Sequence, residues 1–252
     1  MSAPTEPPAP QLAVYYGPAT APALATLAAF PRVVVQAPLY TPEQLAALRG
    51  GSTHVLAYLS VGEDHPLGDW ECRPGSAAYH QQPNAAWPSV VVDAAHPLWH
   101  STLLTRAEQA LEHTDGLLLD TLESADPAAT LALLRHLRAV FPQAALWANR
   151  GFTLWPALPE LLRSAPDSGV LFEAFSTHHT PYALHDVAGL AYTAAWLTEV
   201  RRSGLAVHAL DYADRPELAA AARARAAALN LPTFVSDRAL SRPGGWPALE
   251  EL

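Results

Sequence analysis

Two carboxylates stand at the ends of apolar stretches of this sequence. Asp120 ends the segment GLLLD at residues 116–120, and Glu173 lies in the segment GVLFEAF at residues 169–175. A buried carboxylate is costly without partners, so acids at such positions are candidates for chemistry. Two facing carboxylates are what glycoside hydrolysis requires, because one protonates the leaving oxygen while the other attacks carbon or activates water. The structural alternatives are an N-cap role for Asp120 and a partnered buried position for Glu173.

The segments that must position these acids alternate between β-rich and Ala/Leu-rich stretches. Such alternation is typical of a (β/α)8 TIM barrel, and the 252 residues suit a single domain of that fold, which takes ~250. The alternative is a doubly wound open sheet, but no G-x-G-x-x-G loop follows the first strand to support dinucleotide binding. We predict eight strands, at residues 12–17, 32–36, 54–63, 116–120, 145–151, 169–175, 206–212 and 232–237.

Catalytic residues of such barrels come from the C-terminal ends of the strands. Side chains alternate along a strand, so Asp120 shares the face of Leu118, and Glu173 shares the face of Leu171. Both acids follow even-numbered strands and can therefore face one another across one layer of the barrel mouth. Further polar residues at strand ends are candidates to bind the substrate: Tyr16, Tyr58, Ser60, Glu63, Asn149, Asp211 and Tyr212.

A long insert, residues 64–100, follows the third predicted strand. It contains Trp70 and other tryptophans, and a further strand-like run at residues 89–93. Loops of this length are usually functional, so we expect the insert to contribute to the cleft.

Composition excludes several functional classes. The chain has no lysine, which rules out Schiff-base chemistry and a P-loop lysine, and it carries a formal net charge of −9, which disfavours nucleic acid. No apolar run approaches the ~18 residues that cross a membrane. The single cysteine, Cys72, excludes an internal disulfide, and the absence of H-E-x-x-H and of G-x-S-x-G gives no support to zinc or serine chemistry. We therefore predict no cofactor and no metal.

The domain boundaries follow from the same patterns. Residues 1–11 are Pro-rich and are predicted to be a disordered leader, and residues 12–252 form the barrel domain. The leader lacks the charged and apolar regions of a signal peptide. Localisation is left open. We expect a secreted or periplasmic protein if an export signal was trimmed from the precursor, and a cytoplasmic protein otherwise. We expect a monomer.

Five segments resemble the successive motifs of glycoside hydrolase family 114. They are VLAYLSVGEDHPLGDW, DGLLLDTLES, ALWANRG, GVLFEAF and VHALDYAD, in that order within residues 12–240. The family includes endo-α-1,4-polygalactosaminidases with a (β/α)8 fold. The resemblance implies Asp120 and Glu173 as the catalytic pair, and it places Asp93, at the end of the VVVD run, near the cleft.

The resemblance thus implies a retaining endo-glycosidase for an α-1,4-linked galactosamine or N-acetylgalactosamine polysaccharide, or for a related polysaccharide. Asp120 would be the nucleophile and Glu173 the acid/base, although the two roles can be exchanged. We expect Tyr16, Tyr58, Tyr212, Trp70 and the other insert tryptophans to stack on sugar rings. The alternatives are a non-catalytic carbohydrate-binding barrel that kept the cleft, and a different barrel enzyme using Glu173 as a base.

Overall fold

Eight parallel strands build a nearly closed barrel, as predicted. The computed structural model describes residues 11–67 and 70–247, so residues 1–10 of the predicted leader lie outside the described part of the chain. Each strand pairs with its neighbours along the chain. The barrel strands are β1 (Ala13–Tyr15), β2 (Arg32–Val35), β3 (His54–Ser60), β7 (Gly116–Asp120), β8 (Ala145–Asn149), β9 (Gly169–Glu173), β12 (Ala206–Tyr212) and β13 (Thr233–Ser236).

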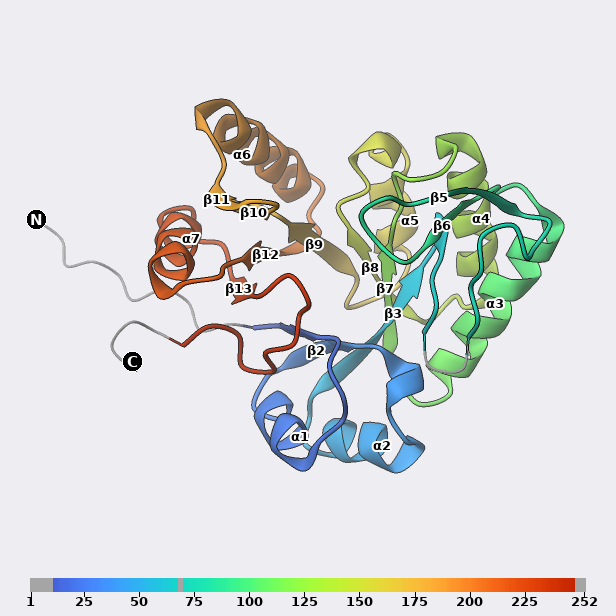
Figure 1. The fold of residues 1–252 in the computed structure, drawn as a ribbon, viewed down its shortest axis with the longest axis horizontal. Helices are drawn as coiled ribbons and strands as arrows, with labels where there is room; N and C mark the ends of the chain where they lie inside the picture. Colours follow the sequence, from blue (N-terminus) through green and yellow to red (C-terminus); the bar gives the residue numbers. More distant parts are fainter. Residues whose placement is uncertain (1–10, 68–69, 248–252) are drawn as a thin grey trace, which may run out of the picture.

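Helices surround the strands on the outside (Figure 1). Their starts follow from local chemistry: Thr41, for example, caps α2 in a reciprocal capping box with Gln44, with proline at the first helical position. Two 3₁₀ turns, Ala37–Leu39 and Phe152–Leu154, follow β2 and β8. The helices are α1 (Ala21–Leu27), α2 (Pro42–Gly50), α3 (Pro97–Leu111), α4 (Pro127–Val140), α5 (Leu158–Arg163), α6 (Val187–Arg202) and α7 (Pro216–Ala228).

Side chains fill the N-terminal half of the barrel interior. Trp147 is fully buried there, with the Arg32 guanidinium 4.6 Å from its ring centroid and the His208 ring at 5.2 Å. Gly169 makes room for this indole, because a Cβ at that position would meet Trp147 at 2.8 Å. The barrel is therefore a packed core at this end.

The insert after β3 is a small sheet of its own. Its strands β4 (Glu63–Asp64), β5 (His80–Pro83) and β6 (Val90–Val92) pair antiparallel in the order β4–β6–β5, and β6 confirms the strand predicted at residues 89–93. A hairpin of β10 (Thr177–His179) and β11 (Tyr182–Leu184) follows β9. These strands are too short for a recognisable alternation of apolar residues.

The barrel has one seam, between β13 and β1. Among the described residues these strands form no ladder, but the Tyr16 amide donates to the Leu240 carbonyl at 2.9 Å, and Phe30 packs on Phe234 with ring centroids 6.0 Å apart. The chain after β13 is thereby held against the end of β1. Leu240 reaches this position with a left-handed φ of 51°.

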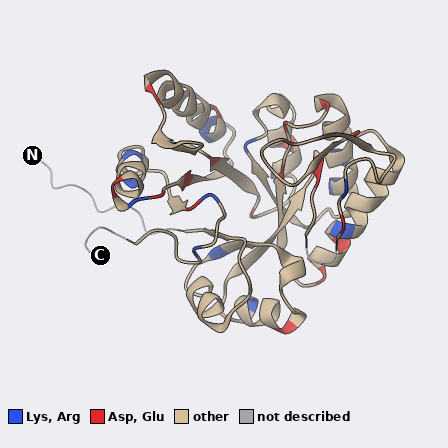
Figure 2. Cartoon of the chain, in the orientation of Figure 1, with Lys and Arg blue, Asp and Glu red and all other residues tan. Residues whose placement is uncertain are grey.

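Charged residues lie scattered over many elements, and the basic positions do not gather on one helix or strand (Figure 2). No helix in the described part of the chain is long and apolar enough to cross a bilayer.

Candidate active site

A cavity of about 530 Å³ opens at the C-terminal ends of the barrel strands. This volume is typical of sites for small ligands. Seven of the residues predicted from the sequence line it: Tyr16, Tyr58, Glu63, Asp120, Asn149, Glu173 and Tyr212.

One amide group joins the two candidate catalytic acids. Asn149 Nδ2 donates to Asp120 Oδ1 at 2.8 Å and to Glu173 Oε2 at 2.5 Å. Because the two bonds share one atom, the Oδ1–Oε2 separation cannot exceed their combined length. The three residues end the adjacent strands β7, β8 and β9, so the barrel itself sets this spacing.

The backbone turns in the same way after each of these three residues. Thr121, Arg150 and Ala174 have φ values of 59°, 55° and 51°. A non-glycine residue in the left-handed region costs about 1–3 kcal/mol and persists only where its surroundings enforce it. The repetition at three adjacent strand ends means that the chain leaves the barrel abruptly just after each functional side chain.

Hydrogen bonds of the Thr121 hydroxyl stabilise the left-handed turn at this residue. Its hydroxyl accepts the amides of Val61 at 3.1 Å and Gly62 at 2.9 Å, and it donates to the Asp120 carbonyl at 2.7 Å. Any Cβ on Gly62 would meet the Thr121 carbonyl at 2.2 Å, so only glycine fits there. The end of β3 is thereby fastened to the end of β7.

Burial and neighbouring charges shift the pKa values of Asp120 and of the phenols beside the acid pair. The pKa of Asp120 is raised to about 6, first by burial and then by the neighbouring Glu173 carboxylate, against the hydrogen bonds from Asn149, the Thr121 amide and Tyr58. Burial and both acids also raise the pKa values of Tyr16 and Tyr212 well above 10. These phenols stay protonated, and the Tyr212 hydroxyl donates to Glu173 Oε1.

Glu63 supplies a third carboxylate to the cavity wall, and neutral donors hold both of its oxygens. Ser124 donates to Oε1 at 2.6 Å and Ser89 to Oε2 at 2.5 Å. Asn84 Nδ2 lies 3.1 Å from each oxygen. No cationic side chain is among its described partners.

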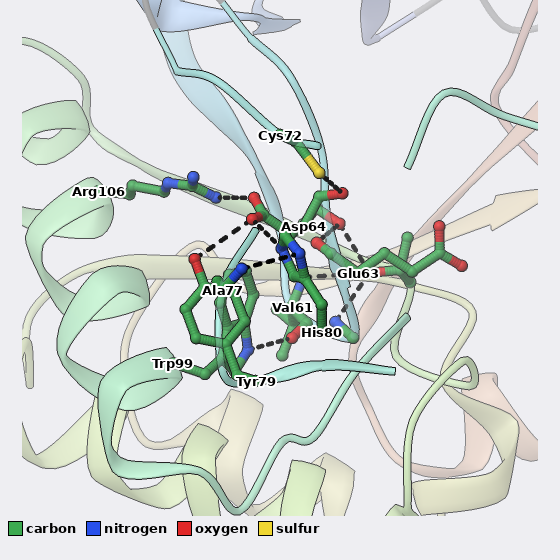
Figure 3. A network of polar contacts seen from close by, with 12 residues as sticks. Val61, Glu63, Asp64, Cys72, Ala77, Tyr79, His80, Trp99 and Arg106 are labelled. Atoms are coloured by element: carbon green, nitrogen blue, oxygen red, sulfur yellow. Dashed lines mark hydrogen bonds and ion pairs between the residues drawn. The ribbon is translucent and has the colours of Figure 1, made fainter. Parts of the chain in front are cut away.

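Asp64, next in sequence, has a different set of buried partners, which Figure 3 draws together with Glu63. Its carboxylate binds Arg106 Nη1 at 2.9 Å and His80 Nε2 at 2.8 Å, and it accepts the Tyr79 hydroxyl at 3.3 Å. The Cys72 thiol donates to the Asp64 carbonyl at 3.1 Å. Burial raises the pKa of the Cys72 thiol to about 11, and the Arg106 guanidinium pairs with the Asp64 carboxylate.

Trp70 contacts this group of residues and does not line the cavity. The Arg106 guanidinium lies 4.4 Å from its ring centroid. The tryptophan that does line the cavity is Trp87, from the loop between β5 and β6, with 40 % of its surface exposed.

Three further predicted residues lie outside the cavity lining. Ser60 is buried and donates to the Glu63 carbonyl at 2.7 Å, which helps to shape the turn after β3. Asp93 accepts the Ala95 amide at 3.0 Å, just before α3. Asp211 is fully buried, and its Oδ1 accepts the amides of the loop after β9.

The sequence reasoning missed several lining residues. Asn84, Ser89 and Ser124 hold Glu63, and only their location in or beside predicted loops could have indicated them. Arg238, after β13, lies over Trp87 at 4.4 Å and donates to the Ala86 carbonyl at 2.8 Å. It fastens the insert to the loop that follows the last strand.

Comparisons with known proteins agree with the barrel fold. The sequence matches no family model, and no curated protein matches it. Among solved structures, the glycoside hydrolase domain of PelA from Pseudomonas aeruginosa matches with a TM-score of 0.78 and 28 % identity, over 94 % of this chain and 97 % of that one. The fold and the match support a barrel glycoside hydrolase.

The resemblance to glycoside hydrolase family 114 predicted from the motifs is confirmed. Similar solved structures also include Ega3 from Aspergillus fumigatus. Ega3, solved in complex with galactosamine, matches with a TM-score of 0.67 and 13 % identity, over 95 % of this chain and 96 % of that one. An α-galactosidase from Thermus thermophilus matches with a TM-score of 0.55 and 15 % identity, over 96 % of this chain and 60 % of that one. These two matches speak for the fold alone.

Proposed function

We propose that this protein is a retaining endo-glycosidase that cleaves α-1,4-linked galactosamine or N-acetylgalactosamine polymers. The observation that carries the proposal is the amide of Asn149 shared by Asp120 and Glu173. Its two bonds hold the nearest carboxylate oxygens closer than the ~6.5–9.5 Å of inverting enzymes, which must fit a water between the acids. The separation favours direct attack by one carboxylate.

In the first step, the Glu173 carboxylic acid gives its proton to the glycosidic oxygen as that bond breaks, and an Asp120 carboxylate oxygen bonds to the anomeric carbon. In the second step, Glu173 removes a proton from water, and the water oxygen displaces Asp120, which leaves ionised. Asp120 must therefore be ionised at the start, and its pKa of about 6 permits this at neutral pH. The mechanism requires that the proton of the pair reside on Glu173 at the start.

The exchanged assignment, with Glu173 as the nucleophile, is separable by experiment. Azide can replace the missing group in an alanine variant of either acid. In the acid/base variant, azide attacks the glycosyl-enzyme and gives the retained glycosyl azide. In the nucleophile variant, azide attacks the substrate directly and gives the inverted one. We expect the retained product from Glu173→Ala and the inverted product from Asp120→Ala.

The charge of the cavity supports a cationic amino sugar. Glu63, Asp120 and Glu173 line it, against Arg238 and the His65 imidazole. Arg150, which follows Asn149 in the sequence, does not line the cavity: its Nε lies 3.9 Å from Glu123, and its guanidinium lies 5.4 Å from the Phe152 ring centroid. A free 2-ammonium group therefore meets a net negative surface.

The test is an assay of reducing ends on α-1,4-linked galactosamine polymers of graded acetylation, with amylose as the neutral comparison. We expect cleavage to increase with the free amine content and to vanish in Asp120→Asn and Glu173→Gln. Binding of the polymer without new reducing ends would instead establish the alternative, a carbohydrate-binding barrel.

A further inference from the structure

Side chains on two sides of the backbone loop that follows Glu173 hold it by hydrogen bonds, and these side chains do not line the cavity. We propose that Asp211 and Arg225 are positioning residues that hold this loop, residues 174–177, and thereby fix the Glu173 carboxylate in its reactive place. The inference rests on the proposed function for the role of Glu173. Its structural part can be tested without substrate.

Asp211 grips the loop from the β12 side. Its Oδ1 accepts the amide of Ser176 at 2.6 Å and the amide of Thr177 at 2.9 Å. The Thr177 hydroxyl lies 3.3 Å from the same oxygen. Charge-assisted bonds to a carboxylate are stronger than neutral ones, so three donors on one oxygen bind the loop tightly.

Arg225 grips the same loop from α7. Its Nη1 donates to the Phe175 carbonyl at 2.7 Å, and its guanidinium lies 4.1 Å from the Phe175 ring centroid. Its Nη2 donates to the Leu190 carbonyl and to the Thr193 hydroxyl of α6, both at 2.8 Å. Arg225 thus ties the loop to two outer helices.

The end of β12 holds Glu173 in two ways at once. Adjacent residues of a strand point to opposite faces. Tyr212 points into the cavity, where its hydroxyl donates to the Glu173 carboxylate. Asp211 points away and holds the backbone just beyond Glu173. The Tyr212 amide also donates to the Thr177 hydroxyl at 2.7 Å, and the same hydroxyl contacts Asp211 Oδ1. Thr177 therefore connects the loop to both Asp211 and Tyr212.

Two energetically unfavourable features of the structure support a functional role for the contacts that hold this loop. Ala174, directly after Glu173, has a left-handed φ of 51°, which needs external support. Asp211 is fully buried and does not line the cavity. Its Oδ2 has no hydrogen-bond partner among the described residues. Burying a carboxylate with one oxygen unsatisfied is unfavourable for folding, so its retention calls for an explanation.

The experiment compares Asp211→Ala with Asp211→Asn. The alanine removes every contact to the loop, whereas the asparagine carbonyl still accepts from the same donors. On the cleaved galactosamine polymer we expect Asp211→Ala to lower kcat about 10–100-fold with KM within about twofold, because the acid is misplaced and the sugar contacts remain. We expect Asp211→Asn to recover most of kcat.

The matched control is Asp115→Ala, at the opposite end of the barrel. Asp115 also accepts a strand amide, that of Val55 at 2.9 Å, and binds Arg49 at 2.9 Å. Its loss should lower stability and leave kcat unchanged. An equal loss of kcat in Asp115→Ala, or no recovery in Asp211→Asn, would overturn the proposal. If Asp211→Ala does not fold, Thr177→Val takes its place, because it removes one donor to Asp211 and the acceptor of the Tyr212 amide.

A crystal structure of the Asp211→Ala or Thr177→Val variant separates this inference from the proposed function. We expect Glu173 Oε2 to move out of hydrogen-bond reach of Asn149 Nδ2. If Glu173 is unmoved, the positioning role is excluded. If the wild-type protein cleaves no polymer in the panel, the proposed function fails, while this displacement still decides whether Asp211 positions Glu173.

Discussion

Asp120 and Glu173 accept hydrogen bonds from the same nitrogen atom, Nδ2 of Asn149, and each also has a phenol beside it. The shared donor draws two like charges together, and their mutual repulsion makes one bound proton favourable. A pair with one proton is the state from which a two-carboxylate mechanism starts. Burial and the neighbouring Glu173 carboxylate therefore favour a bound proton on Asp120 below a pH of about 6.

Removing the shared donor should damage catalysis directly. In Asn149→Ala the two acids lose the group that aligns them, and we expect kcat to fall about 10²–10³-fold, as for the loss of other preorganised donors. Asn84→Ala is the matched control, because it removes an amide donor from Glu63 and leaves the catalytic pair intact. Steady-state kinetics of both variants decide the matter, and similar kcat losses would contradict the role given to Asn149.

The raised pKa of Asp120 makes a prediction about stability. The folded protein holds a proton on Asp120 up to a pH of about 6, whereas the unfolded chain releases it near 3.8. The stability associated with this group is therefore complete below pH 3.8 and is lost as the pH rises through 6. Asp120→Asn removes the buried charge and should stabilise the protein by about 1–3 kcal/mol at pH 7, with little effect at pH 3.5. Denaturant unfolding at the two pH values measures this, and a variant less stable than wild type at pH 7 would speak against it.

The tryptophans of the insert should behave differently from one another. Trp87 lines the cavity, so Trp87→Ala should raise KM about 5–20-fold with little change in kcat, because a stacking surface for sugar is lost. Trp70 packs on Arg106, so Trp70→Ala should lower the melting temperature and leave KM unchanged. Kinetics and thermal unfolding of the two variants provide the comparison. A KM increase confined to Trp70→Ala would reverse the assignment.

The Tyr212 hydroxyl is the second donor to Glu173, and its removal should affect the chemical step. We expect Tyr212→Phe to keep the fold, since the ring stays packed against His179 at 5.0 Å, and to lower kcat about 10–100-fold. Circular dichroism checks the fold, and kcat over a range of pH checks the role. A variant with wild-type kcat at every pH would remove Tyr212 from the account.

The barrel and its acids could be predicted because both depend on local patterns. The run of leucines before Asp120 and the apolar residues around Glu173 mark strands, and the barrel rule places strand ends at one mouth. The alternation of side chains along a strand could also have excluded Asp211 from the predicted substrate-binding residues. Tyr212 faces the cavity, so its neighbour Asp211 must face away, and the two could not both bind substrate.

The insert could not be resolved from the sequence in the same way. Trp70 and Trp87 lie in one polar, loop-like segment, and which of them faces the cavity depends on the pairing of β4, β5 and β6. That pairing is fixed by distant contacts, such as Asp64 with Arg106 and Arg238 with the Ala86 carbonyl. No periodicity in the insert encodes them.

The anomeric form of the first product tests the central claim most directly. Proton NMR of an α-1,4-linked galactosamine polymer, recorded in the first minutes after addition of the protein, distinguishes α from β reducing ends before they interconvert. We expect α ends first, with no product from Asp120→Asn or Glu173→Gln. Initial β ends, or undiminished cleavage by either variant, would contradict it.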